Sequence, residues 1–309
     1  MKSAAIRGII VASFLASSFF LTVSLSEAKT VKLACSANKT LNNTIPKLKP
    51  GDVLVVSGTC NENVLIQPNI NRITIDGQNL ATINGADPAE TTLRIRGHDI
   101  TVRNLTITGG NNGIRIQLST AALIDGVTVD NSGGTGIAVQ GSSFARIVNS
   151  TIQNNPGNGI SVTENSSARI GFLANNDTVA SPNTITGNNR GIAVSESSTA
   201  VIIGNTISNN TSDGILVNTV SHADIASNTI DANGENGINF GRNSGVDLGA
   251  DTGTTIFELP NSTTVGSENG DFGLRCFINS YADRRLGTLN GLSGAKDAFV
   301  GGCIDSTIP

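Results

Sequence analysis

The chain has 309 residues, of which 14% are charged, and its formal net charge is −4 at pH 7. It contains no Trp and a single Tyr. Nucleic-acid binding relies on a strong positive field and on aromatic stacking platforms, so this composition excludes nucleic acid as a partner.

Residues 1–28 predict a secretory signal peptide. Lys2 and Arg7 precede an apolar run from Gly8 to Leu25, and the small-residue sequence ending at Ala28 predicts cleavage there. A membrane anchor is the alternative, but Ser and Thr residues dilute the run and a cleavage site follows at once. The mature protein is therefore expected to be a monomer without a membrane segment, secreted or periplasmic.

Residues 29–60 predict an N-terminal cap and the first turn of a repeat. The segment from Thr40 to Lys47 can form a short helix across an open end of the fold. Pro50-Gly51-Asp52 then turns the chain, and a strand is expected to begin at Val53.

Residues 61–240 carry a repeat of about 23 residues. Gly-Ile pairs begin at Gly113, Gly136, Gly159, Gly191, Gly214 and Gly237, with gaps of 23, 23, 32, 23 and 23. A second column has Thr before Ile or Val, from Thr106 to Thr229, and a third has Ala-x-Ile, from Ala122 to Ala223. Each segment alternates apolar and polar residues, which predicts three strands per turn. The expected fold is all-β, a single-stranded parallel β-helix of eight or nine turns, capped at both ends.

The repeat contains one insertion and two columns of asparagine. The gap of 32 residues indicates that residues 171–182 bulge from one corner, either as a plain loop or as an added binding surface. Asparagines mark the corners, and we expect ladders of stacked Asn side chains rather than glycosylation sites. The first column is Asn131, Asn154, Asn188, Asn209 and Asn233, and the second is Asn104, Asn149, Asn183, Asn205 and Asn228.

Residues 241–309 predict the C-terminal turns and cap. The four cysteines lie near the two ends, and export makes disulfides the expected state. Four cysteines allow three pairings, of which proximity favours Cys35 with Cys60 and Cys276 with Cys303. A metal site is disfavoured, because there is no CxxC motif and neither His lies near a cysteine in the sequence.

The opening from Pro50 to Val64 and the repeat from Asn205 to Ile215 resemble right-handed parallel β-helix proteins of the pectin-lyase-like superfamily. The resemblance covers about residues 29–240 and includes its carbohydrate-binding and sugar-hydrolase repeats. It implies a right-handed coil and a polysaccharide or cell-surface glycan as partner. It does not imply one activity, because this fold hosts lyases, hydrolases, epimerases and proteins without catalysis. Cys60 departs from the pattern, since related sequences often have an aromatic residue there.

A first charged cluster follows from the register. Glu164 and Glu196 both lie five residues after their Gly, so they should stack about 5 Å apart, and Arg146 and Arg169 should stack likewise. The two carboxylates could form a retaining acid and nucleophile pair or part of a cation site. The alternative is two solvated corner glutamates beside surface arginines.

A second cluster contains Arg94, Arg96, His98, Asp99 and Arg103, with Arg115 as a candidate one turn on, and could hold an anionic sugar with His98 or an arginine as base. The alternative is an ordinary polar turn. We expect His222 to lie in a surface bend without a partner. Asp247 and Asp251 are only weak candidates for binding a cation.

The outward residues of the Gly-Ile strands are nearly uncharged, and this lowers the expectation of an enzyme. The sequence therefore favours an exported β-helix that binds a glycan or is structural, without catalysis, cofactor or metal. The alternative is a polysaccharide lyase, epimerase or hydrolase acting on an acidic glycan, for which calcium is the cofactor to consider.

Overall fold

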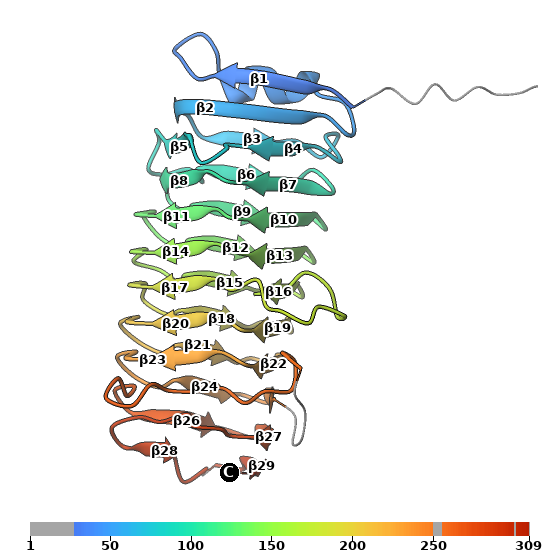
Figure 1. The fold of residues 1–309 in the computed structure, drawn as a ribbon. Coiled ribbons are helices and arrows are strands. Elements are labelled where there is room, and N and C mark those ends of the chain that lie inside the picture. The colour runs from blue at the N-terminus through green and yellow to red at the C-terminus, as the bar shows by residue number, and fades with distance from the viewer. Residues whose placement is uncertain (1–27, 250–254, 300, 309) are drawn as a thin grey trace, which may run out of the picture.

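The computed structural model describes residues 28–249, 255–299 and 301–308 and shows one long coil of parallel strands (Figure 1). The predicted all-β parallel β-helix is confirmed, but it has about 12 turns rather than eight or nine. The end turns were missed because they keep the strands and lose the Gly-Ile pair. The predicted signal peptide lies outside the described residues, and no described helix is long and apolar enough to cross a membrane.

Three sheets run along the coil, one for each column of the repeat. The Ala-x-Ile sheet contains β1 (Thr30–Ala34), the first half of β2 (Val53–Asn61), β4 (Thr74–Asp76), β7 (Ile100–Arg103), β10 (Ala121–Asp125), β13 (Phe144–Val148), β16 (Ser167–Ile170), β19 (Thr199–Ile203), β22 (His222–Ala226), β25 (Gly245–Leu248), β27 (Tyr281–Arg285) and β29 (Ile304–Ile308). The Thr-Ile sheet contains the second half of β2, β5 (Ala81–Gly85), β8 (Thr106–Gly109), β11 (Thr128–Asp130), β14 (Thr151–Gln153), β17 (Thr184–Thr186), β20 (Thr206–Ser208) and β23 (Thr229–Asp231). The Gly-Ile sheet contains β3 (Val64–Ile66), β6 (Leu93–Ile95), β9 (Ile114–Ile116), β12 (Ile137–Val139), β15 (Ile160–Val162), β18 (Ile192–Val194), β21 (Ile215–Val217), β24 (Ile238–Gly241), β26 (Phe272–Phe277) and β28 (Gly294–Lys296).

The core is built from identical residues stacked in register. In the Ala-x-Ile sheet, for example, Ile147, Ile170, Ile202 and Ile225 pair one above the next and are fully buried. Because β-branched side chains pack well on a pleated surface, each turn offers its neighbour the same apolar shape. Outward positions on the same strands are left free to form a site.

The N-terminal end is closed as predicted, with one strand more than expected. The helix α1 (Leu41–Thr44) and the 3₁₀ helix η1 (Ile45–Lys47) cross the opening, and β1 pairs with β2. Glu62 ties the helix to the coil, because its carboxylate accepts from the backbone N–H groups of Leu41 and Asn42. Both predicted disulfides are confirmed, with Cα separations of 5.1 Å for Cys35–Cys60 and 6.3 Å for Cys276–Cys303.

Stacked Asn side chains do form ladders, but the two columns predicted from the sequence mix two kinds of Asn. Asn131, Asn154 and Asn209 have left-handed backbone, with φ of 54–55°. The buried ladder lies one residue further on, at Asn155 and Asn210, and continues through Asn188 and Asn233 to Asn269. The sequence does not reveal this shift, because the ladder residues Asn155 and Asn210 directly follow Asn154 and Asn209. A second ladder runs from Asn183 through Asn205 and Asn228 to Asn261.

The insertion at residues 171–182 leaves the stack intact, as predicted. Strands on either side of it pair without a shift, with Ile170 opposite Ile202 and Ile160 opposite Ile192. The extra residues project from the corner beside the Ala-x-Ile sheet (Figure 1). They therefore border the outer face of that sheet.

Candidate active site

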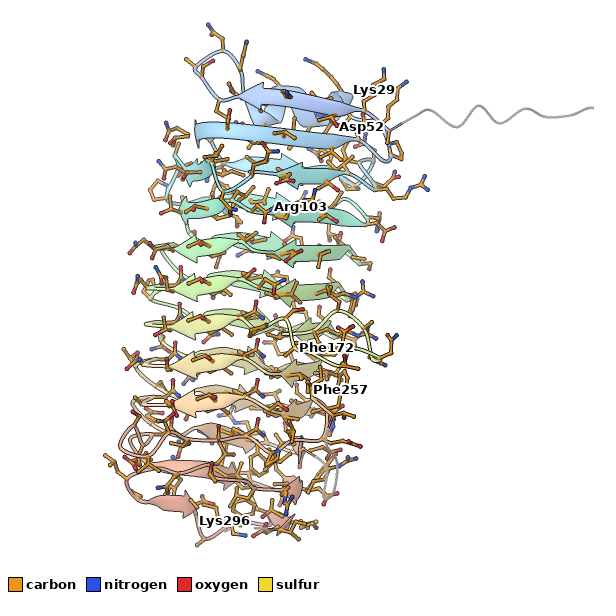
Figure 2. The ribbon with its side chains drawn as sticks, in the orientation of Figure 1. Lys29, Asp52, Arg103, Phe172, Phe257 and Lys296 are labelled. Carbon is orange, nitrogen blue, oxygen red and sulfur yellow. A yellow bond between two sulfur atoms is a disulfide. The ribbon has the colours of Figure 1, made fainter. Side chains whose placement is uncertain are left out.

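A small apolar cluster outside the coil joins two loops over the Ala-x-Ile sheet. Phe172 from the insertion covers Ile203 and Ala226, and all three are buried. Phe257, from the loop that follows β25, packs edge-on against Phe172 with ring centroids 5.1 Å apart (Figure 2). Burial of this apolar surface holds the insertion and the later loop together as one wall beside the sheet.

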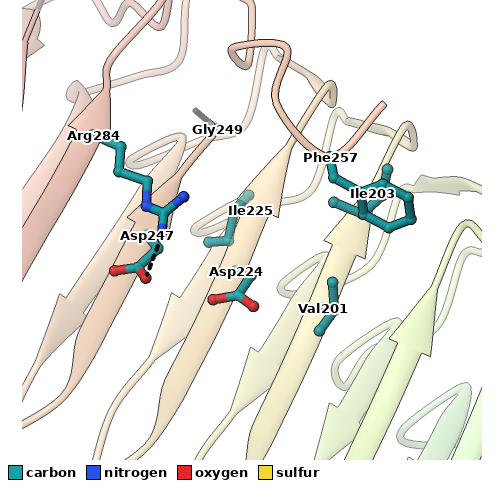
Figure 3. Close-up of a pocket in the computed structure, with 8 residues that line it drawn as sticks. All are labelled: Val201, Ile203, Asp224, Ile225, Asp247, Gly249, Phe257 and Arg284. Carbon is teal, nitrogen blue, oxygen red and sulfur yellow. Dashed lines mark ion pairs between the residues drawn. The ribbon is translucent and has the colours of Figure 1, made fainter. Parts of the chain in front are cut away.

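The wall and the sheet enclose a groove with two adjoining cavities. The cavity of about 240 Å³ contains Asp224, Asp247 and Arg284, and the cavity of about 520 Å³ extends under the insertion. Val201, Asp224 and Phe257 line both. Figure 3 shows the apolar residues Val201 and Phe257 on one side, Arg284 and Asp247 on the other, and Asp224 between them.

Three aspartates form a column on the Ala-x-Ile sheet, and the first two of them line the groove. Asp224, Asp247 and Asp283 are paired in register on consecutive strands β22, β25 and β27. They follow Val201, which stands one strand earlier. Because the strands lie about 4.8 Å apart, the column places carboxylates at that spacing along the groove.

His222 and Tyr281 form a second outward column beside the aspartates. Tyr281 lies two strands after His222, with Gly245 between them. The absent side chain at Gly245 lets the two rings approach, because a Cβ there would lie 2.2 Å from the Tyr281 ring. The Tyr281 hydroxyl is 3.1 Å from His222 Nδ1, and His222 Nε2 is 3.0 Å from Asp224 Oδ1. We call Tyr281, His222 and Asp224 the relay.

Arg284 completes the site through an unusual backbone. It lies opposite the buried Leu248 in register, yet with φ of 73° its side chain leaves the core and is half exposed. Its Nη2 is 3.8 Å from Asp247 Oδ2, which is also 3.9 Å from His222 Nε2. Left-handed backbone recurs at other non-glycine residues of the described chain, and at Arg284 it turns the side chain out of the core toward Asp247.

The surroundings of the site raise the pKa of both ring residues. The hydrogen bond to Asp224 raises the pKa of His222 above 6.5, against the opposing effect of partial burial. Burial, followed by the charge of Asp247, raises the pKa of Tyr281 above 10.0.

We expect His222 to titrate above pH 6.5, and the substitution Asp224→Asn to lower that pKa. Since folding raises the pKa, the charged imidazole stabilises the fold below pH 6.5, and this contribution is lost as the pH rises through the folded pKa. Proton NMR can follow the imidazole signals, with His98, the chain's only other histidine, as internal reference. The difference in Tm between wild type and His222→Gln should shrink over the same pH range. An imidazole that titrates below pH 6.5 would contradict this arrangement.

The first predicted cluster forms only in part. Glu164 and Glu196 occupy exposed corner turns on adjacent turns of the coil, and both have left-handed backbone. Arg146 and Arg169 do stack in register, but both donate to the Leu173 carbonyl, at 3.1 Å. The arginines thus support the insertion, and a ligand role for the four residues stays a prediction.

The second predicted cluster is divided between two sheets. Arg94 and Arg115 stack in register on the Gly-Ile sheet, where Arg94 also pairs with Glu90 at 2.9 Å. Arg103 instead lies on the Ala-x-Ile sheet and binds Asp76, also at 2.9 Å. His98 lies between the sheets and forms an isolated β-bridge with Asn71, while Arg96 directly follows β6. Their role in binding an anionic sugar also stays a prediction.

The expectation for His222 is wrong, because this residue begins β22 and has two partners rather than lying in an isolated bend. Asp247 is likewise part of a stacked column, whereas Asp251 lies outside the described residues. The sequence did contain a signal for two members of the column. Asp224 stands between Ala223 and Ile225 of a repeat, and Asp247 follows it by 23 residues.

Comparison with known proteins identifies the fold. The family model described as a right handed beta helix region matches residues 91–172 and 161–252, which together exceed half of the chain. None of the curated protein sequences compared with the chain matches it significantly.

Three solved structures show how widely this fold is shared. The A-module of the Azotobacter vinelandii mannuronan C-5 epimerase AlgE6 superposes with a TM-score of 0.57 at 13% identity, covering 91% of each chain. Pectate lyase Pel9A gives 0.55 at 12% identity, over 89% of this chain and 80% of the lyase. A mutant of the periplasmic alginate epimerase AlgG gives 0.54 at 15% identity, over 91% of this chain and 73% of the epimerase. At these identities the likeness is one of fold alone.

Proposed function

The chain belongs to the right-handed β-helix family, and from its groove we propose that it binds an acidic polysaccharide and transfers a proton at a uronic acid unit. The reaction class is that of a lyase or an epimerase. The relay of Tyr281, His222 and Asp224, with Arg284 beside it, is the observation that carries this proposal. The solved structures named above include a pectate lyase and alginate epimerases, which adds weak support.

The relay provides a route for the proton. With His222 protonated on Nε2, that N–H donates to Asp224, and Nδ1 accepts from the Tyr281 hydroxyl. Tyr281 can then take the proton from the carbon next to the sugar carboxylate while its own proton passes to His222. Asp224 stabilises the imidazolium that results.

Arg284 suits the other half of the reaction. Loss of the proton pushes the bonding electrons into the sugar carboxylate, and a guanidinium stabilises the added negative charge. The electron pair then either expels the oxygen on the neighbouring ring carbon, which takes a proton from water as the double bond forms, or takes up a proton from water on the opposite face. The first outcome is lyase chemistry and the second is epimerisation.

Calcium is not part of this proposal. His222, Asp224 and Asp247 each offer one atom within 4.8 Å of the others. Calcium takes oxygen ligands, however, and the imidazole in this set does not fit that preference. The relay, of which Asp224 lines the groove, therefore supports a proton transfer carried by side chains.

The proposed location is the periplasm or the cell exterior. Two disulfides favour an oxidising compartment, where polysaccharides of this type are met. The protein would act there as a monomer on a glycan of the cell surface or surroundings.

Incubation with pectate, alginate and other polyuronates, with and without calcium, tests the proposal. A lyase gives unsaturated sugar ends, which absorb in the ultraviolet. An epimerase working in deuterated water replaces the proton next to the carboxylate by deuterium, which NMR detects. If no polymer of the panel loses or exchanges that proton, while binding by the protein is measurable, the earlier expectation of glycan binding without catalysis is correct instead.

Hydrolysis is a second candidate, favoured by one specific observation. Carboxylate oxygens of Asp224 and Asp247 lie within 4.8 Å of each other, which is near the separation of about 5 to 5.5 Å between the carboxyl groups of retaining glycosidases. In the same assay a hydrolase would release reducing ends without unsaturated product or deuterium.

A further inference from the structure

The cavity next to the relay differs in character from the relay itself. It has a volume of about 520 Å³, enough for more than one sugar unit, and reaches from Asp224 under the insertion. Val201 and Phe257 give it an apolar surface. The amides of Asn175 and Asn176 and the hydroxyls of Thr178 and Thr255 surround that surface with neutral hydrogen-bonding groups.

The ionised groups along this cavity are acidic. Asp177 and Glu258 line it with Asp224, and the described lining includes no Lys or Arg. Two of these carboxylates are fixed by the loops that carry them. Asp177 accepts from the backbone N–H groups of Leu173 and Ala174, at 2.8 and 2.9 Å, and Glu258 accepts from the Thr255 hydroxyl at 3.0 Å.

Arg169 on the sheet offsets this charge only in part, since its effect on the pKa of Asp177 is smaller than that of the backbone hydrogen bonds. Arg169 stands one strand before Val201 in the same outward column, but its guanidinium donates to the Leu173 carbonyl and stacks on Phe172. A second sugar carboxylate placed over Val201 would therefore face Asp177 and Glu258 without a dedicated cation. Repulsion between the sugar carboxylate and these two acidic side chains would weaken binding.

Resting on the proposed function, we propose that this cavity is a subsite for an uncharged sugar. The substrate would then be a heteropolysaccharide in which the reactive uronate has a neutral neighbour, rather than a polymer of uronates alone. The apolar face of a sugar ring fits Val201 and Phe257, and its hydroxyls fit the surrounding amides and hydroxyls. The uronate remains beside Arg284.

Partly carboxyl-reduced polymers test the subsite, because reduction turns uronates into neutral sugars without changing the linkages. Binding of polygalacturonate and alginate oligosaccharides is measured by calorimetry before and after partial reduction. We expect partial reduction to tighten binding by about fivefold, since it removes one repulsive contact, and complete reduction to weaken it again. Affinity that only falls as carboxylates are removed would overturn the subsite.

Two substitutions change the charge of the cavity, and Glu258→Gln does so away from the relay, whereas position 201 lies opposite Asp224 on the next strand. Glu258→Gln removes a carboxylate, and Val201→Arg continues the column of Arg146 and Arg169 by one strand. Both should tighten binding of unreduced polyuronates by about three- to tenfold and reduce the preference for partly reduced ones. The matched control is Thr184→Arg, which adds the same charge at an exposed position of the Thr-Ile sheet.

These outcomes separate the subsite from the reaction. Loss of turnover in relay variants, together with unchanged polymer preference in Glu258→Gln and Val201→Arg, would support the proton transfer and reject the neutral subsite. A preference for partly reduced polymers without any turnover would support the subsite and reject the reaction. Equal effects of Thr184→Arg and Val201→Arg would show a general charge effect and also reject the subsite.

Discussion

Tyr281→Phe is expected to lower kcat by about 100- to 1,000-fold with little change in KM, because it removes a proton-transfer group and leaves the ring in place. The Tyr281 hydroxyl contacts the His222 ring at the surface of the sheet, and 43% of the residue is exposed. Its loss therefore does not open the core. Initial rates on the best polymer of the panel, with Tm measured in parallel, check this expectation.

His222→Asn should give a loss of the same order, and the double variant with Tyr281→Phe should be little worse than either single variant. Residues that act as one unit are non-additive in this way. His98→Asn is the matched control, since it replaces the chain's other histidine at a turn away from the groove. Rates within threefold of wild type for both Tyr281→Phe and His222→Asn would remove the relay from the reaction.

Tyr281 also provides a direct spectroscopic readout of the site. It is the only Tyr in a chain without Trp, so the ultraviolet absorbance of its phenolate reports this one group. The titration should lie above pH 10.0, in the direction that burial and the neighbouring carboxylates require. In Asp247→Asn it should move down, because one of those charges is gone.

The fold was predictable because the central turns repeat the same local pattern. Stacking Ile147, Ile170 and Ile202 in register needs only the 23-residue spacing and the position of the insertion. The same reasoning reaches Asp224 and Asp247, which continue the outward Ala-x-Ile column. The sequence reasoning used this column for Arg146 and Arg169 but did not extend it past the insertion to the aspartates.

Tyr281 and Arg284 were beyond sequence reasoning for a physical reason. The spacing from Asp247 to Asp283 is 36 residues rather than 23, and the segment between them has no repeat. The register of β27 on β25 is therefore not given by a 23-residue spacing, although the intervening β26 pairs with β24 in the Gly-Ile sheet. The exposure of Arg284 depends further on a positive φ that no sequence signal at an arginine indicates.

Asn228→Ala is expected to lower the free energy of unfolding by about 3 to 5 kcal/mol, since each orphaned buried partner costs about 1 to 3 kcal/mol. The side chain is fully buried and donates to the Ile202 and Ala226 carbonyls, at 2.8 and 3.0 Å. It also accepts from the backbone N–H of Asn205 at 2.9 Å. Alanine supplies none of these contacts.

The same substitution should also weaken binding in the groove, because the ladder continues into the loop that carries Phe257. Asn228 donates to Asn261 at 2.9 Å, and Asn261 in turn donates to the Ile225 carbonyl at 2.7 Å. Loosening Asn261 frees the wall that Phe172 and Phe257 form, so polymer binding should weaken even where the coil remains folded. Denaturant unfolding followed by circular dichroism, with binding measured in parallel, gives both effects.

Asn209→Gly is the control, because this exposed Asn has left-handed backbone that glycine adopts freely, and it should leave both stability and binding near wild type. If Asn228→Ala and Asn209→Gly unfolded at the same denaturant concentration, the ladder would not be what holds the wall over the site.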